Sequence, residues 1–129
     1  MGTMLSVSQT TGLTNPATSA ETVVYTTPVM QLGVGGVFIT LEGLFNAVAG
    51  TATTAVVVRC RQTNLTGTQV GPSLTITVAA GNTYSAPFQF VDLSNFLEGA
   101  AGGVYVITVQ QTSGTGNGTA NVISLQVSV

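Results

Sequence analysis

The chain of 129 residues contains no histidine, no lysine and no tryptophan, and it has a single cysteine. These absences remove the usual histidine and cysteine ligands of a zinc site. One cysteine cannot form a disulfide within the chain, so it does not indicate a redox compartment. A nucleophilic cysteine needs a neighbouring histidine or lysine to lower its pKa, and the chain has neither. We therefore expect Cys60 to be a small buried hydrophobic residue.

Charged side chains are also scarce. They make up 5% of the chain, with two basic and four acidic residues, whereas about 25% is usual. Direct binding of nucleic acid is not expected, because neutralising phosphates takes several lysines or arginines. A net charge of −2 leaves little repulsion between copies. The composition therefore favours a homo-oligomer.

Long apolar runs are absent too. No run approaches the roughly 20 residues of a membrane span, so no membrane span is expected. Residues 1–21, MGTMLSVSQTTGLTNPATSAE, lack the basic and apolar regions of a secretory signal and read as a polar N-terminal arm. Gly2 and Ser6 fit the pattern M-G-x-x-x-[ST] of N-myristoylation, which is the alternative to an unmodified mobile arm.

From residue 22 to residue 129 the chain reads as one domain of strands joined by turns. Four segments alternate between apolar and polar residues with a period of two: SLTITVAA, TYSAPFQFV, GGVYVITVQQ and NVISLQVSV. Each should have one buried and one solvated face, as in a sandwich of two sheets. The turns between them predict about eight strands in an all-β fold.

Three other segments depart from this simple pattern. Two segments, ETVVYTTPVMQL and GGVFITLEGLFNAVA, are more apolar on both faces, which indicates cover by a neighbouring subunit. Pro28 in the first of them predicts an edge position or a break into two short strands. In DLSNFLEGAAGG, Asp92 or Ser94 is expected to cap one short helical turn that ends at Gly99.

Both basic residues, Arg59 and Arg61, lie in TTAVVVRCRQ. In a strand they share one face and lie about 7 Å apart, while Val56, Val58 and Cys60 point to the other face. One interpretation is a solvated face with two scattered charges. The other is a subunit contact or an ion pair within the chain, because the planar fork of arginine binds carboxylates and arginine is enriched at interfaces.

The acids that can pair with these arginines are Glu21, Glu42, Asp92 and Glu98. We expect Arg59 and Arg61 to fix geometry in a subunit contact or an ion pair, not to catalyse. Glu42, Asp92 and Glu98 can in principle supply the paired carboxylates of a glycoside hydrolase, but scattered acids more often serve solubility. The sequence thus predicts a protein that is not an enzyme, with no catalytic residue, no cofactor and no metal site.

The stretch from residue 22 to residue 129 resembles a small single jelly roll in its pattern. The segments that carry the resemblance are TVVYTTPV, GGVFITLEGLF, TTAVVVRCRQ, GGVYVITVQQ and ISLQVSV. Such domains are found in viral capsid and spike proteins and in the related trimeric TNF/C1q-like heads. The resemblance implies a jelly-roll-like antiparallel β-sandwich that assembles into a shell, spike or fibre head. Two features depart from it: residues 1–21 lack the basic residues of RNA-packaging arms, and ISLQVSV lacks the aromatic residues usual in C1q-like heads.

The resemblance leaves two functions. The first is a structural protein of a virion, in contact with copies of itself and with other virion proteins. The alternative is an extracellular or trimeric binding module or adhesin that recognises a carbohydrate or protein ligand. Exposure of Tyr25, Phe38 and Phe45 discriminates between them, because an open cluster of aromatic residues favours ligand binding.

Overall fold

The computed structural model describes residues 3–7, 13–14, 20–32, 38–98, 101–114 and 119–128, and these residues contain no helix. The predicted all-β class is therefore confirmed. The strands are β1 (Thr3–Val7), β2 (Leu13–Thr14), β3 (Thr22–Thr26), β4 (Ile39–Val48), β5 (Thr54–Gln62), β6 (Gln69–Val78), β7 (Thr83–Asp92), β8 (Tyr105–Ser113) and β9 (Thr119–Ser128).

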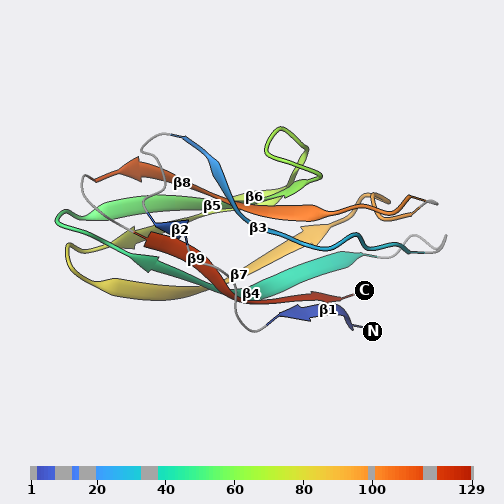
Figure 1. The fold of residues 1–129 in the computed structure, drawn as a ribbon, viewed down its shortest axis with the longest axis horizontal. Helices are drawn as coiled ribbons and strands as arrows, with labels where there is room; N and C mark the ends of the chain where they lie inside the picture. The colour runs from blue at the N-terminus through green and yellow to red at the C-terminus, as the bar shows by residue number, and fades with distance from the viewer. Residues whose placement is uncertain are drawn as a thin grey trace.

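The strands form two antiparallel sheets that lie one over the other as a sandwich (Figure 1). The five-stranded sheet has the order β1-β9-β4-β7, and β2 also pairs with β9. The four-stranded sheet has the order β3-β8-β5-β6. The expected antiparallel sandwich is confirmed at this level.

Pairing between the strands is nested along the sequence. The outermost strands β1 and β2 pair with β9, then β3 pairs with β8, β4 with β7, and β5 with β6. Two further pairings, β4 with β9 and β5 with β8, join these pairs into the two sheets. Strands that are distant in the sequence therefore lie side by side in each sheet.

The core lies between the sheets and is built by the period-two pattern. In β7, Ala86, Phe88 and Phe90 are buried, while Pro87 and Gln89 between them are exposed. Burying a phenylalanine side chain stabilises the fold by about 1.5–3 kcal/mol. The largest fully buried side chains include Tyr105, Phe45, Phe90, Ile39 and Leu41.

Strand β8 differs from the expected pattern of one solvated face. From Tyr105 to Val109 every side chain is buried, including Val106 and Thr108 on the outer side of the sheet. The reason for Thr108 is local, because its Oγ1 donates to Oε2 of Glu21, just before β3, at 2.6 Å. The alternation of residues along a strand predicts which face of the sheet a side chain lies on. It does not predict whether another segment of the chain covers that face.

Pro28 lies where the sequence predicts it. Strand β3 is at the edge of the four-stranded sheet and ends at Thr26, before the proline. Pairing resumes at Met30, which exchanges two backbone hydrogen bonds with Gly103, each 2.8 Å long. The edge position is confirmed for β3. The pairing also breaks at Pro28, but the second short strand is not formed, because Met30 and Leu32 make only isolated bridges.

The short helical turn expected after β7 is not formed. Asp92 is instead the last residue of β7, and its Oδ1 accepts hydrogen bonds from Ser94 N at 2.9 Å and Ser94 Oγ at 2.7 Å. Asn95 O then accepts from Glu98 N at 3.1 Å. Of the two residues expected as a cap, Asp92 accepts these bonds, in a tight turn and not at the start of a helix. Gly99 lies outside the described residues.

Residues 1–21 contain two strands that the sequence does not predict. Thr3 to Val7 pair with the end of β9, and Leu13 and Thr14 pair with its start. The boundary between an arm and the sandwich at residue 21 remains a prediction. Gly2 and Val129 lie outside the described residues.

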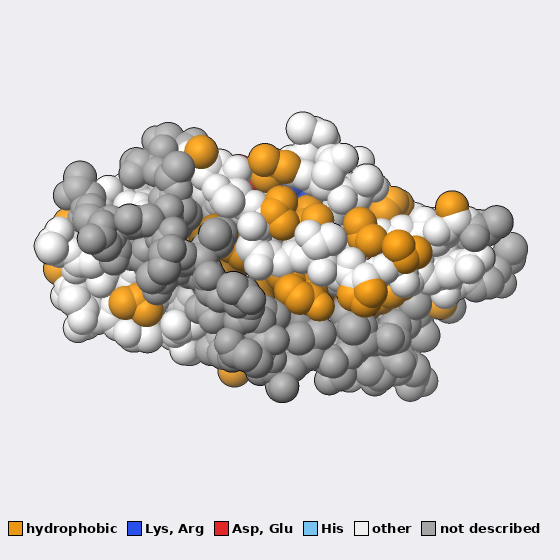
Figure 2. Space-filling view, viewed as in Figure 1, with side chains coloured by type: hydrophobic (Ala, Val, Ile, Leu, Met, Phe, Trp, Pro, Cys, Tyr) orange, Lys and Arg blue, Asp and Glu red, His pale blue; other side chains and the backbone are white. Residues whose placement is uncertain are grey.

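One broad face of the molecule shows the scarcity of charge directly. In Figure 2 the described side chains are hydrophobic or uncharged polar, apart from a small area of basic side chain near the middle. Hydrophobic side chains gather from the middle of this face toward its right-hand side. A surface of this kind provides little electrostatic repulsion against other protein surfaces.

Candidate functional site

Arg59 and Arg61 lie on the outer face of β5, as predicted, with side chains 19% and 20% exposed. Val58 and Cys60 on the opposite face are fully buried in the core. Strand β5 is an inner strand of its sheet, between β8 and β6. The two guanidinium groups therefore lie over the middle of the four-stranded sheet.

Both arginines bind the same carboxylate, that of Glu21 just before β3. Arg61 Nε donates to Glu21 Oε2 at 2.6 Å, and Arg61 Nη2 donates to Glu21 Oε1 at 2.9 Å, a two-pronged arrangement. Arg59 Nη1 lies 3.5 Å from Glu21 Oε1. Thr108 Oγ1 also donates to Glu21 Oε2, at 2.6 Å. We call Glu21, Arg59 and Arg61 the arginine cluster.

The arginine cluster has further partners within the chain. Arg59 Nη1 donates to Gln110 Oε1 at 2.8 Å, and Arg61 Nη1 donates to the carbonyl oxygen of Gly67 at 3.1 Å. No side chain fits at Gly67, because a Cβ there would overlap the carbonyl oxygen of Gln62. The ion pair within the chain, one of the two contacts expected for the arginines, is thus observed, and the subunit contact remains a prediction.

Hydrogen bonds from Arg61 lower the pKa of Glu21. Burial acts in the opposite direction, and the Thr108 hydroxyl and the two guanidinium charges lower the pKa further. Glu21 in turn raises the pKa of Arg61. The cluster combines one carboxylate with two guanidinium groups, and their formal charges sum to one net positive charge.

This geometry predicts a loss of stability in acid that depends on Glu21. Because the pKa of Glu21 is lower in the folded protein than its ordinary value of 4.5, the ionised carboxylate stabilises the fold above that pH. The contribution is lost as the pH falls through the lowered pKa. Denaturation at a series of falling pH values should show a steeper decline for the native chain than for Glu21→Gln. Equal declines would contradict this role of Glu21.

A second polar network joins the two sheets at one end of the sandwich. Asp92 on β7 is buried, and its Oδ2 accepts from the hydroxyl of the fully buried Tyr105 at 2.7 Å and from Gln62 Nε2 at 3.1 Å. Its Oδ1 accepts from Ser94. Burial alone would raise the pKa of Asp92, but the bonds from Tyr105, Ser94 and Gln62 outweigh it and lower the pKa. The carboxylate thus stays ionised and bonded inside the protein.

Cys60 is fully buried, which confirms the sequence prediction. Burial, together with the negative charge of Asp92, raises the pKa of its thiol to about 12. A thiol in this environment stays protonated at neutral pH and is a poor nucleophile. Cys60 therefore serves as core packing in β5.

Two of the acids considered for catalysis point to opposite sides of the five-stranded sheet. Glu42 is exposed in the middle of β4, and Asp92 is buried at the end of β7. The register pairs Glu42 with Gln89 and Asp92 with Ile39. Among the described residues no group of three or more His, Cys, Asp or Glu side chains is arranged to hold a metal ion.

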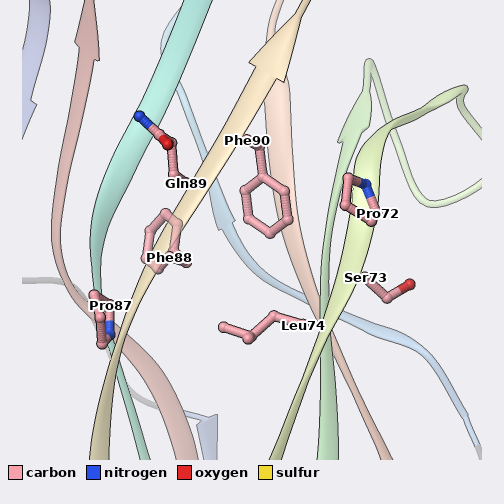
Figure 3. Close-up of a pocket in the computed structure, with 7 residues that line it drawn as sticks. All are labelled: Pro72, Ser73, Leu74, Pro87, Phe88, Gln89 and Phe90. Atoms are coloured by element: carbon pink, nitrogen blue, oxygen red, sulfur yellow. The ribbon is translucent and has the colours of Figure 1, made fainter.

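A small groove opens in the seam between the edge strands β6 and β7 (Figure 3). Its volume is about 160 Å³, below the roughly 300 Å³ at which sites for drug-sized ligands begin. It is lined by Pro72, Ser73, Leu74, Pro87, Phe88, Gln89 and Phe90, with Leu74 and Phe90 turned toward the gap. None of these side chains is an acid or a base.

The three aromatic residues chosen to discriminate between the functions do not share one environment. Phe45 is fully buried in the core, Tyr25 is half-buried against it, and Phe38 is 64% exposed. They therefore do not form one open aromatic platform.

Among the described residues there is no helix of the length and apolarity that a membrane span requires. Comparisons with protein-family models, curated proteins and solved structures gave no match. A functional proposal for this chain therefore rests on its composition, fold and surface.

Proposed function

We propose that this chain is a non-enzymatic structural protein that assembles with copies of itself, as a capsid, decoration, spike or fibre-head component of a virion. Its fold would be a single jelly roll, an eight-stranded sandwich of two Greek keys. The nested pairing supports this, if β1 and β2 count as one strand: first with last, second with seventh, third with sixth and fourth with fifth. Such domains are used in viral capsids but also in lectins and cupins, so the fold alone does not fix the function.

The observation that carries the assembly proposal is that few charged side chains are left at the surface. The chain has only two basic residues, and both bind Glu21 within the chain. A third acid, Asp92, is buried. Little charge is left at the surface to hold copies apart, while several large hydrophobic side chains are exposed. In a virion these faces would be covered by neighbouring copies or by other structural proteins.

The alternative is an extracellular or trimeric module that binds a carbohydrate or a protein ligand. A carbohydrate site usually offers exposed aromatic rings with polar groups beside them. Of the three aromatic residues considered for this role, only Phe38 is largely exposed, and the groove between β6 and β7 is small. The observations therefore favour assembly over ligand binding.

The test is the native mass of the purified protein, measured by light scattering over a concentration series, with electron microscopy of the eluted material. We expect closed oligomers, shells or fibres, with a mass well above that of one chain. A protein that stays monomeric at every concentration would contradict the proposed function, and a carbohydrate-binding screen would then test the alternative.

A further inference from the structure

The exposed hydrophobic side chains are concentrated on one outer face of the sandwich. Among the residues whose burial is described, the large exposed ones are Val29, Phe38, Leu44, Leu65, Tyr84, Val91 and Leu93. Five of these, Phe38, Leu44, Tyr84, Val91 and Leu93, belong to β4 and β7 or directly adjoin them. Tyr84 alternates with the buried Ala86 and Phe88 and so lies on the core side of β7, which leaves four on the outer side. Exposed apolar surface that gathers on one face commonly marks a contact site.

The register places these four residues on the outer side of the five-stranded sheet. Leu44 pairs with the exposed Pro87, and Val91 pairs with Thr40. Phe38 and Leu93 flank the last pair of the ladder, Ile39 with Asp92, and are 64% and 69% exposed. We call the outer side of β4 and β7, with these flanking residues, the β4–β7 face.

The centre of the β4–β7 face carries one negative charge. Glu42 is exposed in β4 and pairs with Gln89 on β7 and Gln126 on β9. Both basic residues of the chain lie on the other sheet with Glu21, so Glu42 has no arginine partner within the chain. Covering this face with a purely apolar surface would leave the carboxylate without a compensating charge, at a large cost in free energy.

The accessible part of the outer side of the four-stranded sheet is complementary in charge to the β4–β7 face. Val106 and Thr108 on β8 are buried, so this part consists of β6 and the arginine cluster on β5. Its edge strand β6 exposes Ser73, Thr75 and Thr77, which carry no charge. Its centre holds the arginine cluster, whose one carboxylate and two guanidinium groups leave one net positive charge. One face therefore has a single central negative charge and the other a single central positive charge.

This pairing of charges favours one mode of contact between copies. If two copies docked through the same β4–β7 face, two Glu42 carboxylates would enter one contact with no cation. Docking of the β4–β7 face on the opposite sheet of the next copy brings unlike charges together. The edge strands β6 and β7 are less suited to strand addition, because Pro72 and Pro87 lack the N–H that pairing uses.

We propose that the β4–β7 face binds the outer side of the four-stranded sheet of a second copy, with Glu42 opposite the arginine cluster. The contact is heterologous, so it repeats from copy to copy and gives a ring or an open filament. It also supplies the subunit contact predicted for Arg59 and Arg61. The inference rests on the proposed function, because it requires self-assembly.

The first test compares the native mass of four variants over a concentration series. Glu42→Arg should weaken self-association by at least about tenfold, because it places like charges together. Leu93→Ser and Glu42→Gln should weaken it less. Asn82→Arg, in the exposed turn before β7, changes the net charge by the same amount as Glu42→Gln and should leave association unchanged.

The second test uses complementary charge reversals. Arg59→Glu copies alone should associate as poorly as Glu42→Arg copies, because Glu42 would then face a net negative cluster. An equimolar mixture of the two variants should associate again, since each contact in an alternating assembly joins opposite charges. Circular dichroism of each variant checks that it is folded, and Arg59→Gln provides a milder substitution if Arg59→Glu does not fold.

The outcomes separate the inference from the proposed function. A native chain that assembles together with a Glu42→Arg variant that assembles equally well would overturn the contact and leave self-assembly standing. Tighter association of Glu42→Gln than of the native chain would show two acids facing each other, and would also overturn it. A native chain that stays monomeric would remove the proposed function and the contact together.

Discussion

Replacing Asp92 with alanine is expected to lower the free energy of unfolding by about 2–4 kcal/mol. The substitution removes Oδ2, the oxygen that accepts from both Gln62 on β5 and Tyr105 on β8 and so joins β7 to the other sheet. The hydroxyl of Tyr105 is then left buried without its partner, and each such group costs about 1–3 kcal/mol. Gln62, which is only partly buried, adds a smaller loss. Urea denaturation measures the change.

Two further variants separate the network from general disturbance of this region. Asp92→Asn keeps one acceptor oxygen and should lose less stability than Asp92→Ala. Ser94→Ala removes a donor whose side chain is exposed, so its loss should be smaller still. If all three variants unfolded at the same denaturant concentration as the native chain, the network would not contribute to stability.

Replacing Phe45 with alanine is expected to cost about 3–5 kcal/mol of stability, because it leaves a cavity in a closely packed core. Phe45 is fully buried on β4. The matched control lies just before the same strand: Phe38→Ala removes an equal volume from a ring that is 64% exposed, and should change the unfolding free energy by less than about 1 kcal/mol. Denaturation of both variants tests the assignment of one ring to the core and the other to the surface.

The Phe38 variant has a second expected effect that the Phe45 variant does not share. Phe38 lies on the β4–β7 face, so Phe38→Ala should weaken self-association while leaving the domain folded. A large loss of stability for Phe38→Ala, or none for Phe45→Ala, would contradict the described positions of the two side chains.

The features that could be predicted from the sequence are those that depend on a few neighbouring residues. Period-two alternation predicted the all-β class, the buried side of β7 and the side of β5 that carries Arg59 and Arg61. The chemistry of single residues placed Cys60 in the core and Pro28 at an edge. Each of these predictions needs only a few neighbouring residues, so a single sequence is sufficient.

The sequence could not show which side chains form ion pairs and hydrogen bonds with each other, because this depends on which strands become neighbours. Glu21 was one of four candidate acids, and it meets Arg61 only because β3 lies beside β8 and β8 beside β5. The bond from Tyr105 to Asp92 crosses from one sheet to the other. Strands β1 and β2 are short, and the sequence around them is polar, so only their pairing with β9 identifies them as strands.

The measurement that tests the account most directly is hydroxyl-radical footprinting of the native chain in dilute and in concentrated solution. The account predicts that oxidation of Phe38 and Leu93 falls as the protein assembles, whereas oxidation of Leu65 and Tyr84, which are also exposed but lie outside the β4–β7 face, stays the same. Unchanged oxidation of Phe38 and Leu93 in fully assembled protein would contradict it.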